Sequence, residues 1–197
     1  QLVAGRLKQE DFNCFLLADS PHFPFKAKDK LYKFLRNGGD LVLTGGAAFS
    51  RPLWHKNDQW LSYAKLENPQ GETEKDFGFH EAFENYEVYE MDRIKEIISY
   101  ERNGETNFIS ERYNITGKFS GRSAVAADFP GKSEFIPLLE ARDQYDRHQG
   151  WGGSLLINFG GRYQGSQWAL FGIKEGSFYQ KEGFRELLAV ILDRFQS

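Results

Sequence analysis

The sequence predicts an α/β fold in which a mostly parallel sheet is flanked by helices, with a long insertion and a late antiparallel hairpin. Residues 12–18 form a continuous apolar run, which is typical of a strand buried on both faces of a parallel sheet. A helical pattern and a second apolar run follow, and the chain closes with an amphipathic helix. A length of 197 residues suits one sizeable core, so a single domain over residues 1–197 is expected.

The first two predicted strands are joined by a predicted helix over residues 28–37. Leu31, Phe34 and Leu35 recur there at spacings of three and four, which places them on one helix face. The glycines at positions 38 and 39 suit a left-handed helix end, and the strand over residues 41–44 follows directly. A strand–helix–strand unit of this kind has a right-handed crossover.

Residues 50–120 break the pattern and are predicted to form an irregular insertion over one end of the sheet. Aromatic residues are scattered among charged ones in this segment, although Ile94, Ile97 and Ile98 fall at helical spacing. The segment is too long for a plain connection. Segments of this length often serve as lids or binding loops.

The last third of the chain is predicted to be rich in strands. Apolar runs cover residues 123–127 and 135–139, and residues 154–159 and 167–173 predict an antiparallel hairpin. The Gly-rich segment 160–166 between them lacks the GxxxxGK[ST] order of a phosphate loop, so a turn is favoured over a phosphate cradle. Apolar residues of the closing helix recur with a helical period: Phe184, Leu187, Leu188, Ile191, Leu192 and Phe195.

Composition excludes several classes of function. The net charge is −3 and the 25 basic residues are dispersed, whereas nucleic-acid binding needs a concentrated cationic face. The single cysteine, Cys14, excludes an intrachain disulfide and lies in an apolar run, so a buried structural thiol is expected. No metal-binding spacing of histidines or cofactor motif is present, and no apolar run has the length of a membrane span. Neither a metal nor a cofactor is therefore expected.

Aromatic residues make up 16 % of the chain, with 18 Phe, 9 Tyr and 4 Trp. They predict either a Phe-rich core or an aromatic-lined ligand surface, since flat rings stack on sugars and other planar faces. The first residue, Gln1, is not an initiator methionine. The chain is accordingly expected to be a mature form or a fragment of a larger protein.

The turn after the strand over residues 41–44 lacks a nucleophile. In many α/β enzymes a Cys or Ser is held on a tight strand-to-helix turn at this point. Here the turn reads Gly-Gly-Ala-Ala over residues 45–48, and none of these side chains can attack a substrate. The sequence therefore has the pattern of such a turn, called the elbow here, without a reactive side chain on it.

The strand–helix–strand unit ending in LRNGGDLVLTGG, the Gly-Ala turn and the late strand pair resemble the class I glutamine amidotransferase-like fold, which is flavodoxin-like. The version with the greatest likeness is the non-catalytic one of multidomain carbohydrate-active proteins, such as the middle domain of some β-galactosidases. Residues 12–49 carry most of the likeness, residues 152–195 are compatible with it, and the middle third has no counterpart. Active members of the family carry a Cys on the elbow and a His after a late strand, and both are missing here. The resemblance implies a degenerate active site and a role in assembly or in shaping a substrate cleft.

Further candidate residues come from the strand ends and from the acidic segment around residues 140–146. Ligands of open α/β sheets bind at the carboxyl ends of strands. The acidic segment suits sugar-hydroxyl acceptors, a cation site or an acid/base pair, and equally an ion-paired loop. The candidate ligand-binding residues are Asp19, Ser20, His22, Gly46, Ala47, Phe49, Arg51, Trp54, His55, Glu140 and Asp143.

Three hypotheses about function follow. The preferred one is a non-catalytic domain that gives structural, assembly or cleft-shaping support in a larger, carbohydrate-processing protein. Its partners would be other domains of the same polypeptide or a second copy, with a carbohydrate as possible ligand, and its location would be extracytoplasmic. The alternatives are a glycoside hydrolase that uses carboxylates such as Asp19, Glu140 and Asp143, and a glycan- or small-ligand-binding module that uses Trp54 or Trp60.

Overall fold

The structure is a computed structural model, and it describes eight segments of the chain. These are residues 12–18, 22–45, 51–62, 86–92, 96–99, 112–114, 120–126 and 133–196. For the four segments between residues 86 and 126, the description is of the backbone. None of the described helices is long and apolar enough to cross a membrane.

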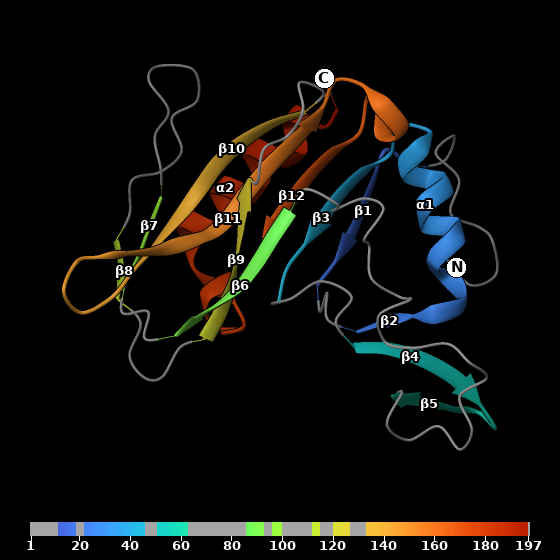
Figure 1. The fold of residues 1–197 in the computed structure, drawn as a ribbon, viewed down its shortest axis with the longest axis horizontal. Coiled ribbons are helices and arrows are strands. Elements are labelled where there is room, and N and C mark those ends of the chain that lie inside the picture. The colour runs from blue at the N-terminus through green and yellow to red at the C-terminus, as the bar shows by residue number, and fades with distance from the viewer. Residues whose placement is uncertain are drawn as a thin grey trace.

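A seven-stranded mixed sheet runs through the molecule in the order β1-β3-β12-β11-β10-β7-β8 (Figure 1). The strand β3 pairs in parallel with both β1 and β12, and the other four pairs are antiparallel. The prediction of a mostly parallel sheet flanked by helices is therefore wrong. The strands of this sheet are β1 (Cys14–Leu17), β3 (Asp40–Leu43), β7 (Glu96–Ser99), β8 (Arg112–Asn114), β10 (Ser133–Arg142), β11 (His148–Asn158) and β12 (Gln167–Phe171).

Connection length explains why the sheet is mixed. Parallel neighbours need a crossover of a dozen or more residues, whereas antiparallel neighbours can be joined by a short turn. Residues 143–147 join β10 to β11 and residues 159–166 join β11 to β12, and both connections are too short for a crossover. The predicted hairpin of β11 and β12 is present, with its turn containing the 3-10 helix η5 (Gly161–Tyr163).

The strand–helix–strand unit at the start of the chain is also present. Helix α1 (Lys28–Arg36) ends as predicted, because Gly38 adopts a φ of 85° and its N–H donates to the carbonyl of Leu35, while Gly39 N–H donates to that of Phe34. The expectation that the first strand is buried on both faces is wrong. β1 is an edge strand, and Leu16 on it is 45 % exposed.

Two hydrophobic clusters lie on opposite faces of the main sheet, because successive residues of a strand point to opposite faces. Leu41 and Leu43 pack with the buried residues of α1, whereas Val42 packs with those of the closing helix α2 (Glu182–Arg194). Burying one large apolar side chain contributes about 1.5–3 kcal/mol, so these clusters hold the two helices to the sheet. α1 and α2 are the two α-helices of the described residues.

Two smaller sheets include strands of the predicted insertion, residues 50–120. β2 (His22–Pro24), β4 (Arg51–Lys56) and β5 (Gln59–Ser62) form one, with β2 followed by the 3-10 helix η1 (Phe25–Ala27). β6 (Tyr86–Asp92) pairs with β9 (Ser120–Ala126), and β9 lies beside β11 (Figure 1). The helical spacing predicted for this segment does not produce a helix at Ile97 and Ile98, since residues 96–99 form β7 and pair with β10, and Ile94 lies outside the described residues. Strand pairing with β10 therefore overrides a short helical period.

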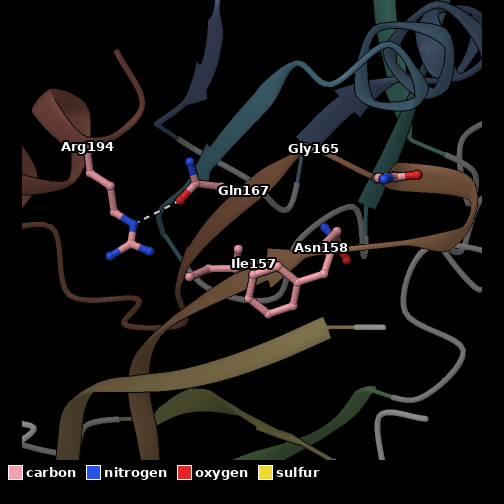
Figure 2. A pocket seen from close by; sticks show the side chains of 7 residues that line it. Ile157, Asn158, Gly165, Gln167 and Arg194 are labelled. Atoms are coloured by element: carbon pink, nitrogen blue, oxygen red, sulfur yellow. Dashed lines mark hydrogen bonds between the residues drawn. The ribbon is translucent and has the colours of Figure 1, made fainter. Parts of the chain in front are cut away.

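The turn between β11 and β12 lies beside the end of α2. Figure 2 shows Arg194 reaching from α2 toward Gln167 at the start of β12, where its Nε donates to Gln167 Oε1 at 2.9 Å. The backbone N–H of Gln167 donates to a carboxylate oxygen of Asp40 at 2.7 Å. These contacts connect α2, β12 and β3 at the end of the sheet where the parallel strands β3 and β12 begin.

Candidate functional site

The candidate site is the tip of the β10–β11 hairpin, defined here as residues 140–151. Asp143 builds its turn, because one carboxylate oxygen accepts hydrogen bonds from the backbone N–H groups of Tyr145 and Arg147, at 2.8 and 3.1 Å. Asp146 takes a left-handed conformation with a φ of 60°, which Asp tolerates better than most residues. The local sequence thus favours a sharp turn that carries several charged side chains.

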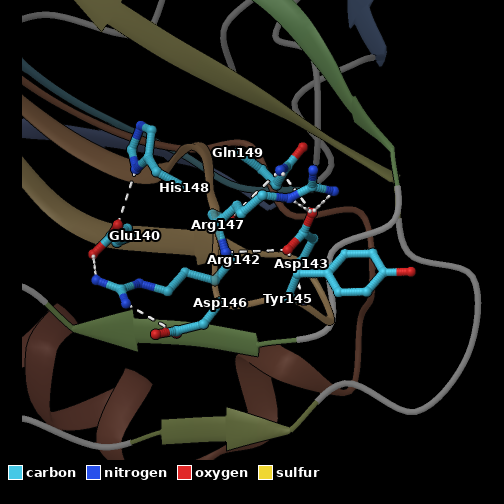
Figure 3. A network of polar contacts seen from close by, with 8 residues as sticks. All are labelled: Glu140, Arg142, Asp143, Tyr145, Asp146, Arg147, His148 and Gln149. Atoms are coloured by element: carbon cyan, nitrogen blue, oxygen red, sulfur yellow. Dashed lines mark hydrogen bonds and ion pairs between the residues drawn. The ribbon is translucent and has the colours of Figure 1, made fainter.

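Each carboxylate of the hairpin tip contacts a basic side chain (Figure 3). Asp143 Oδ2 is 2.7 and 2.8 Å from Nη2 and Nε of Arg147, a two-pronged pairing. Arg142 donates to Glu140 at 3.0 Å and to Asp146 at 2.9 Å. Glu140 is also 3.0 Å from Nδ1 of His148. The tip therefore carries two separate groups of ion pairs, together called the ionic network here: Glu140 with Arg142, Asp146 and His148, and Asp143 with Arg147.

The network keeps Glu140 and Asp143 ionised. Burial would raise the pKa of Glu140, but hydrogen bonds from Arg142 and His148 outweigh it and lower that pKa. The hydrogen bond from the Arg147 side chain lowers the pKa of Asp143, against a smaller effect of burial. A general acid at neutral pH needs a carboxyl with a raised pKa. These two carboxylates instead suit the role of hydrogen-bond acceptors.

Aromatic side chains accompany the ionic network. Tyr145 is 67 % exposed, and the guanidinium of Arg147 lies 4.8 Å from the centre of its ring. The rings of His148 and Trp151 meet edge to face with centres 4.9 Å apart. The tip thus presents an exposed aromatic and guanidinium surface that its own ion pairs hold in position.

Gly45, the last described residue after β3, contacts a tyrosine from the far end of the chain. Tyr179, on the 3-10 helix η6 (Phe178–Gln180), accepts a hydrogen bond from the N–H of Gly45 at 2.9 Å. Its hydroxyl donates to the carbonyl of Ile173. Thr44 donates to the carbonyl of Ala18 at 2.8 Å, which connects the ends of β3 and β1. Burial raises the pKa of Tyr179, so its hydroxyl stays neutral.

Four of the other predicted site residues lie on the small sheet of β2, β4 and β5. His22 is the register partner of Arg51 in the parallel pair of β2 and β4. Trp54 stacks on Phe25 with ring centres 4.9 Å apart, and His55 lies 4.9 Å from the ring of Trp60. The remaining predicted residues fall outside the described part of the chain: Asp19, Ser20, Gly46, Ala47 and Phe49.

The predicted residues do not meet in one place. β4 and β5 lie at one end of the molecule and the turn between β10 and β11 at the other (Figure 1). Glu140 and Asp143 therefore lie far from the group on β4. Among the described residues, no cluster of three or more His, Cys, Asp or Glu side chains could hold a metal ion.

Sequence reasoning missed the contact of His148 with Glu140 and the role of Tyr179. His148 lies eight residues after Glu140, and the contact depends on the strand register across the hairpin. The Asp-x-Tyr-Asp-Arg order could have predicted the tight turn that brings His148 back toward Glu140, since Asp at the start of a tight turn accepts backbone N–H bonds. No local pattern marks Tyr179, because it is 134 residues from Gly45.

No protein-family model matches the chain, and no curated protein sequence does either. Among solved structures, an α-L-fucosidase isoenzyme from Paenibacillus thiaminolyticus is similar with a TM-score of 0.52 and 14 % identity over 97 % of this chain. A β-galactosidase from Rahnella sp. R3 is similar with a TM-score of 0.50 and 11 % identity over 96 %. This chain spans 26 % and 24 % of those two chains. At such identities the likeness extends to the fold alone, and it lends no support to the amidotransferase-like resemblance or to a degenerate active site.

Proposed function

We propose that this chain is a non-catalytic domain of a larger carbohydrate-processing protein and that it docks onto a neighbouring domain through the tip of the β10–β11 hairpin. The observation that carries the proposal is the exposed Tyr145 ring beside Arg147, whose guanidinium is paired with Asp143. Tyr and Arg are enriched at the energetic centres of protein interfaces. An exposed pair of this kind is a natural anchor.

The ion pairs of the tip favour docking over catalysis. Asp143 holds both the backbone of the turn and the Arg147 side chain, so the surface loses little conformational freedom when a partner binds. Glu140 and Asp143 are each held ionised by cations, which does not suit the proton donor of a glycoside hydrolase.

The proposed occupant of the tip is another domain of the same polypeptide. The two similar structures are a β-galactosidase and an α-L-fucosidase, and this chain spans about a quarter of each. A module of that relative size contacts its neighbours through a limited part of its surface. The β10–β11 hairpin extends beyond the ends of the neighbouring strands and is well placed for such a contact (Figure 1).

Radical footprinting of Tyr145 tests the proposal, with the longest natural polypeptide that contains the chain compared with the 197-residue chain. We expect Tyr145 to be labelled several-fold more slowly in the longer polypeptide. In that polypeptide, Tyr145→Ala with Arg147→Ala should separate the unfolding transitions of the two domains, whereas the control Phe159→Ala, at a similarly exposed ring, should not. Equal labelling of Tyr145 in both proteins would overturn the proposed interface.

Catalysis is tested separately on a panel of aryl glycosides. Glu140→Gln is expected to leave any turnover of the longer polypeptide unchanged. A loss of turnover in this variant, with the fold intact by circular dichroism, would favour the hydrolase hypothesis.

A second candidate function, glycan binding, is favoured by the aromatic pair on the β4–β5 hairpin. Trp60 is 50 % exposed and its ring lies beside that of His55. Exposed indole rings provide a stacking surface for the apolar face of a sugar. Saturable binding of an oligosaccharide that is lost in Trp60→Ala and kept in Tyr145→Ala would support this function.

A further inference from the structure

An open pocket of about 520 Å³ lies between the end of β11, the start of β12 and the end of α2. Figure 2 shows Ile157 and Asn158 from β11, Gln167 from β12 and Arg194 from α2 around it. Because β12 runs parallel to β3, the pocket lies at the end of the sheet where these strands begin, and Gly45 lies at the opposite end. Ligands of open α/β sheets bind at the carboxyl ends of the parallel strands, so this tendency did not predict a pocket at their amino ends.

The polar groups of the pocket are planar amides and one guanidinium. Gln167 Oε1 accepts from Arg194 Nε at 2.9 Å, which turns the Gln167 amide nitrogen away from that contact. Within the described residues, neither that nitrogen nor the exposed side-chain amide of Gln164 has a protein partner. Each amide offers donors and an acceptor at short spacing, which matches neighbouring hydroxyl groups. None of the described lining residues carries a carboxylate.

An apolar wall completes the pocket. Phe159 is 59 % exposed although it follows a buried strand, and Ile157 lines the same pocket. An exposed ring next to unpartnered amides combines a stacking surface with hydrogen-bonding groups. Asn158 fixes the backbone of this wall, since its side chain donates to the carbonyl of Ser166 at 2.9 Å and accepts from Ser133 at 3.0 Å.

We infer that this pocket binds a pyranose sugar, with one apolar ring face against Phe159 and adjacent hydroxyls hydrogen-bonded to Gln164 and Gln167. The sugar is either neutral or a uronic acid, because both offer the same hydroxyls and the single Arg194 can accommodate a carboxylate. A nucleotide fits less well, since its phosphates carry several negative charges and Arg194 is the one cation among the described lining residues. The site is separate from the hairpin tip and from Trp60, and its existence does not depend on the proposed function.

Two-dimensional NMR of the 197-residue chain tests the inference, with methyl glucoside, glucuronic acid and adenosine as separate probes. We expect saturable shifts of the Gly165 backbone amide and of the Gln164 and Gln167 side-chain amides, at millimolar sugar concentration. Phe159→Ala and Gln164→Ala should each weaken binding about tenfold, and Phe159→Trp should restore a stacking surface and retain binding. The matched control is Phe12→Ala, at another exposed ring that lies in none of the proposed sites, and it should bind as the unaltered chain does.

Saturable binding of either sugar, weakened in Phe159→Ala and in Gln164→Ala, supports the site. Tighter binding of glucuronic acid than of methyl glucoside would show that Arg194 selects for the carboxylate. The inference is overturned when neither sugar gives saturable shifts, when the shifts persist unchanged in Phe159→Ala and Gln164→Ala, or when adenosine alone binds. Footprinting of Tyr145 is unaffected by any of these results, so the two proposals fail independently.

Discussion

The hydroxyl of Tyr179 accepts a hydrogen bond from the backbone N–H of Gly45, 2.9 Å away and 134 residues earlier in the chain. The same hydroxyl donates to the carbonyl of Ile173 and lies 3.2 Å from that of Phe171. One side chain thus satisfies backbone groups at the end of β3 and just after β12. Tyr179 thus joins the chain just after β3 to the chain at the end of β12.

Replacing Tyr179 with Phe should destabilise the fold. The ring would still pack, but the Gly45 N–H and the Ile173 carbonyl would lose their partner. Leaving such groups unsatisfied costs about 1–3 kcal/mol. Urea unfolding should show a lower free energy of unfolding by that amount, while Tyr145→Phe, on the exposed tip, should show almost none. Equal midpoints for Tyr179→Phe and the unaltered chain would contradict this account.

Asp40 should make stability fall as the pH rises. Burial raises the pKa of Asp40 from 3.8 to about 6, against the opposing hydrogen bond from Gln167 N–H. The folded state therefore binds more protons than the unfolded state between these values, and the free energy of unfolding falls as the pH rises through that window. Asp40→Asn keeps an acceptor for Gln167 and removes the charge.

The variant Asp40→Asn should accordingly be more stable than the unaltered chain at about pH 7, by roughly 1–3 kcal/mol, and similar to it below about pH 4. Urea unfolding of both proteins across this range measures the difference. If the free energies of unfolding of the two proteins changed with pH in parallel, Asp40 would not be the cause of the pH dependence.

Gly153 and Gly176 should respond in opposite ways to alanine. A Cβ at Gly153 would lie 2.7 Å from the Phe171 ring and 3.0 Å from Leu139, whereas a Cβ at Gly176 would meet nothing within 4 Å. Overpacking a core costs about 1–3 kcal/mol. Gly153→Ala should lower the midpoint of thermal unfolding, and Gly176→Ala should leave it unchanged or raise it slightly. Equal midpoints for Gly153→Ala and Gly176→Ala would contradict this prediction and would show that the Phe171 and Leu139 side chains can move to admit the extra methyl group.

Local sequence patterns predicted the elements whose determinants lie close together. The apolar period of α2 and the glycines after α1 are such patterns, and both features are present. Strand direction could not be read in the same way. An apolar run such as 135–139 pairs equally well in either direction, and the short connection to β11 decides that it pairs antiparallel.

The candidate site was predicted in part. The acidic residues Glu140 and Asp143 stand out in the sequence, and the turn between them and Arg147 follows from Asp and its neighbours. Their grouping with His22 and His55 was not testable without the tertiary structure, which separates the hairpin tip from β4 and β5. The pocket at Gln167 was missed because its lining comes from three elements brought together by folding.

The sequence by itself determined the strand–helix–strand start, the late hairpin, the closing helix and the absence of a nucleophile at residues 45–48. These depend on side-chain period, turn residues and residue identity, which are local properties. The tertiary structure alone decided the strand order of the mixed sheet, the edge position of β1 and the bond from Gly45 to Tyr179. Each of these depends on which distant surfaces pack together, and that choice is made by the free energy of the whole fold.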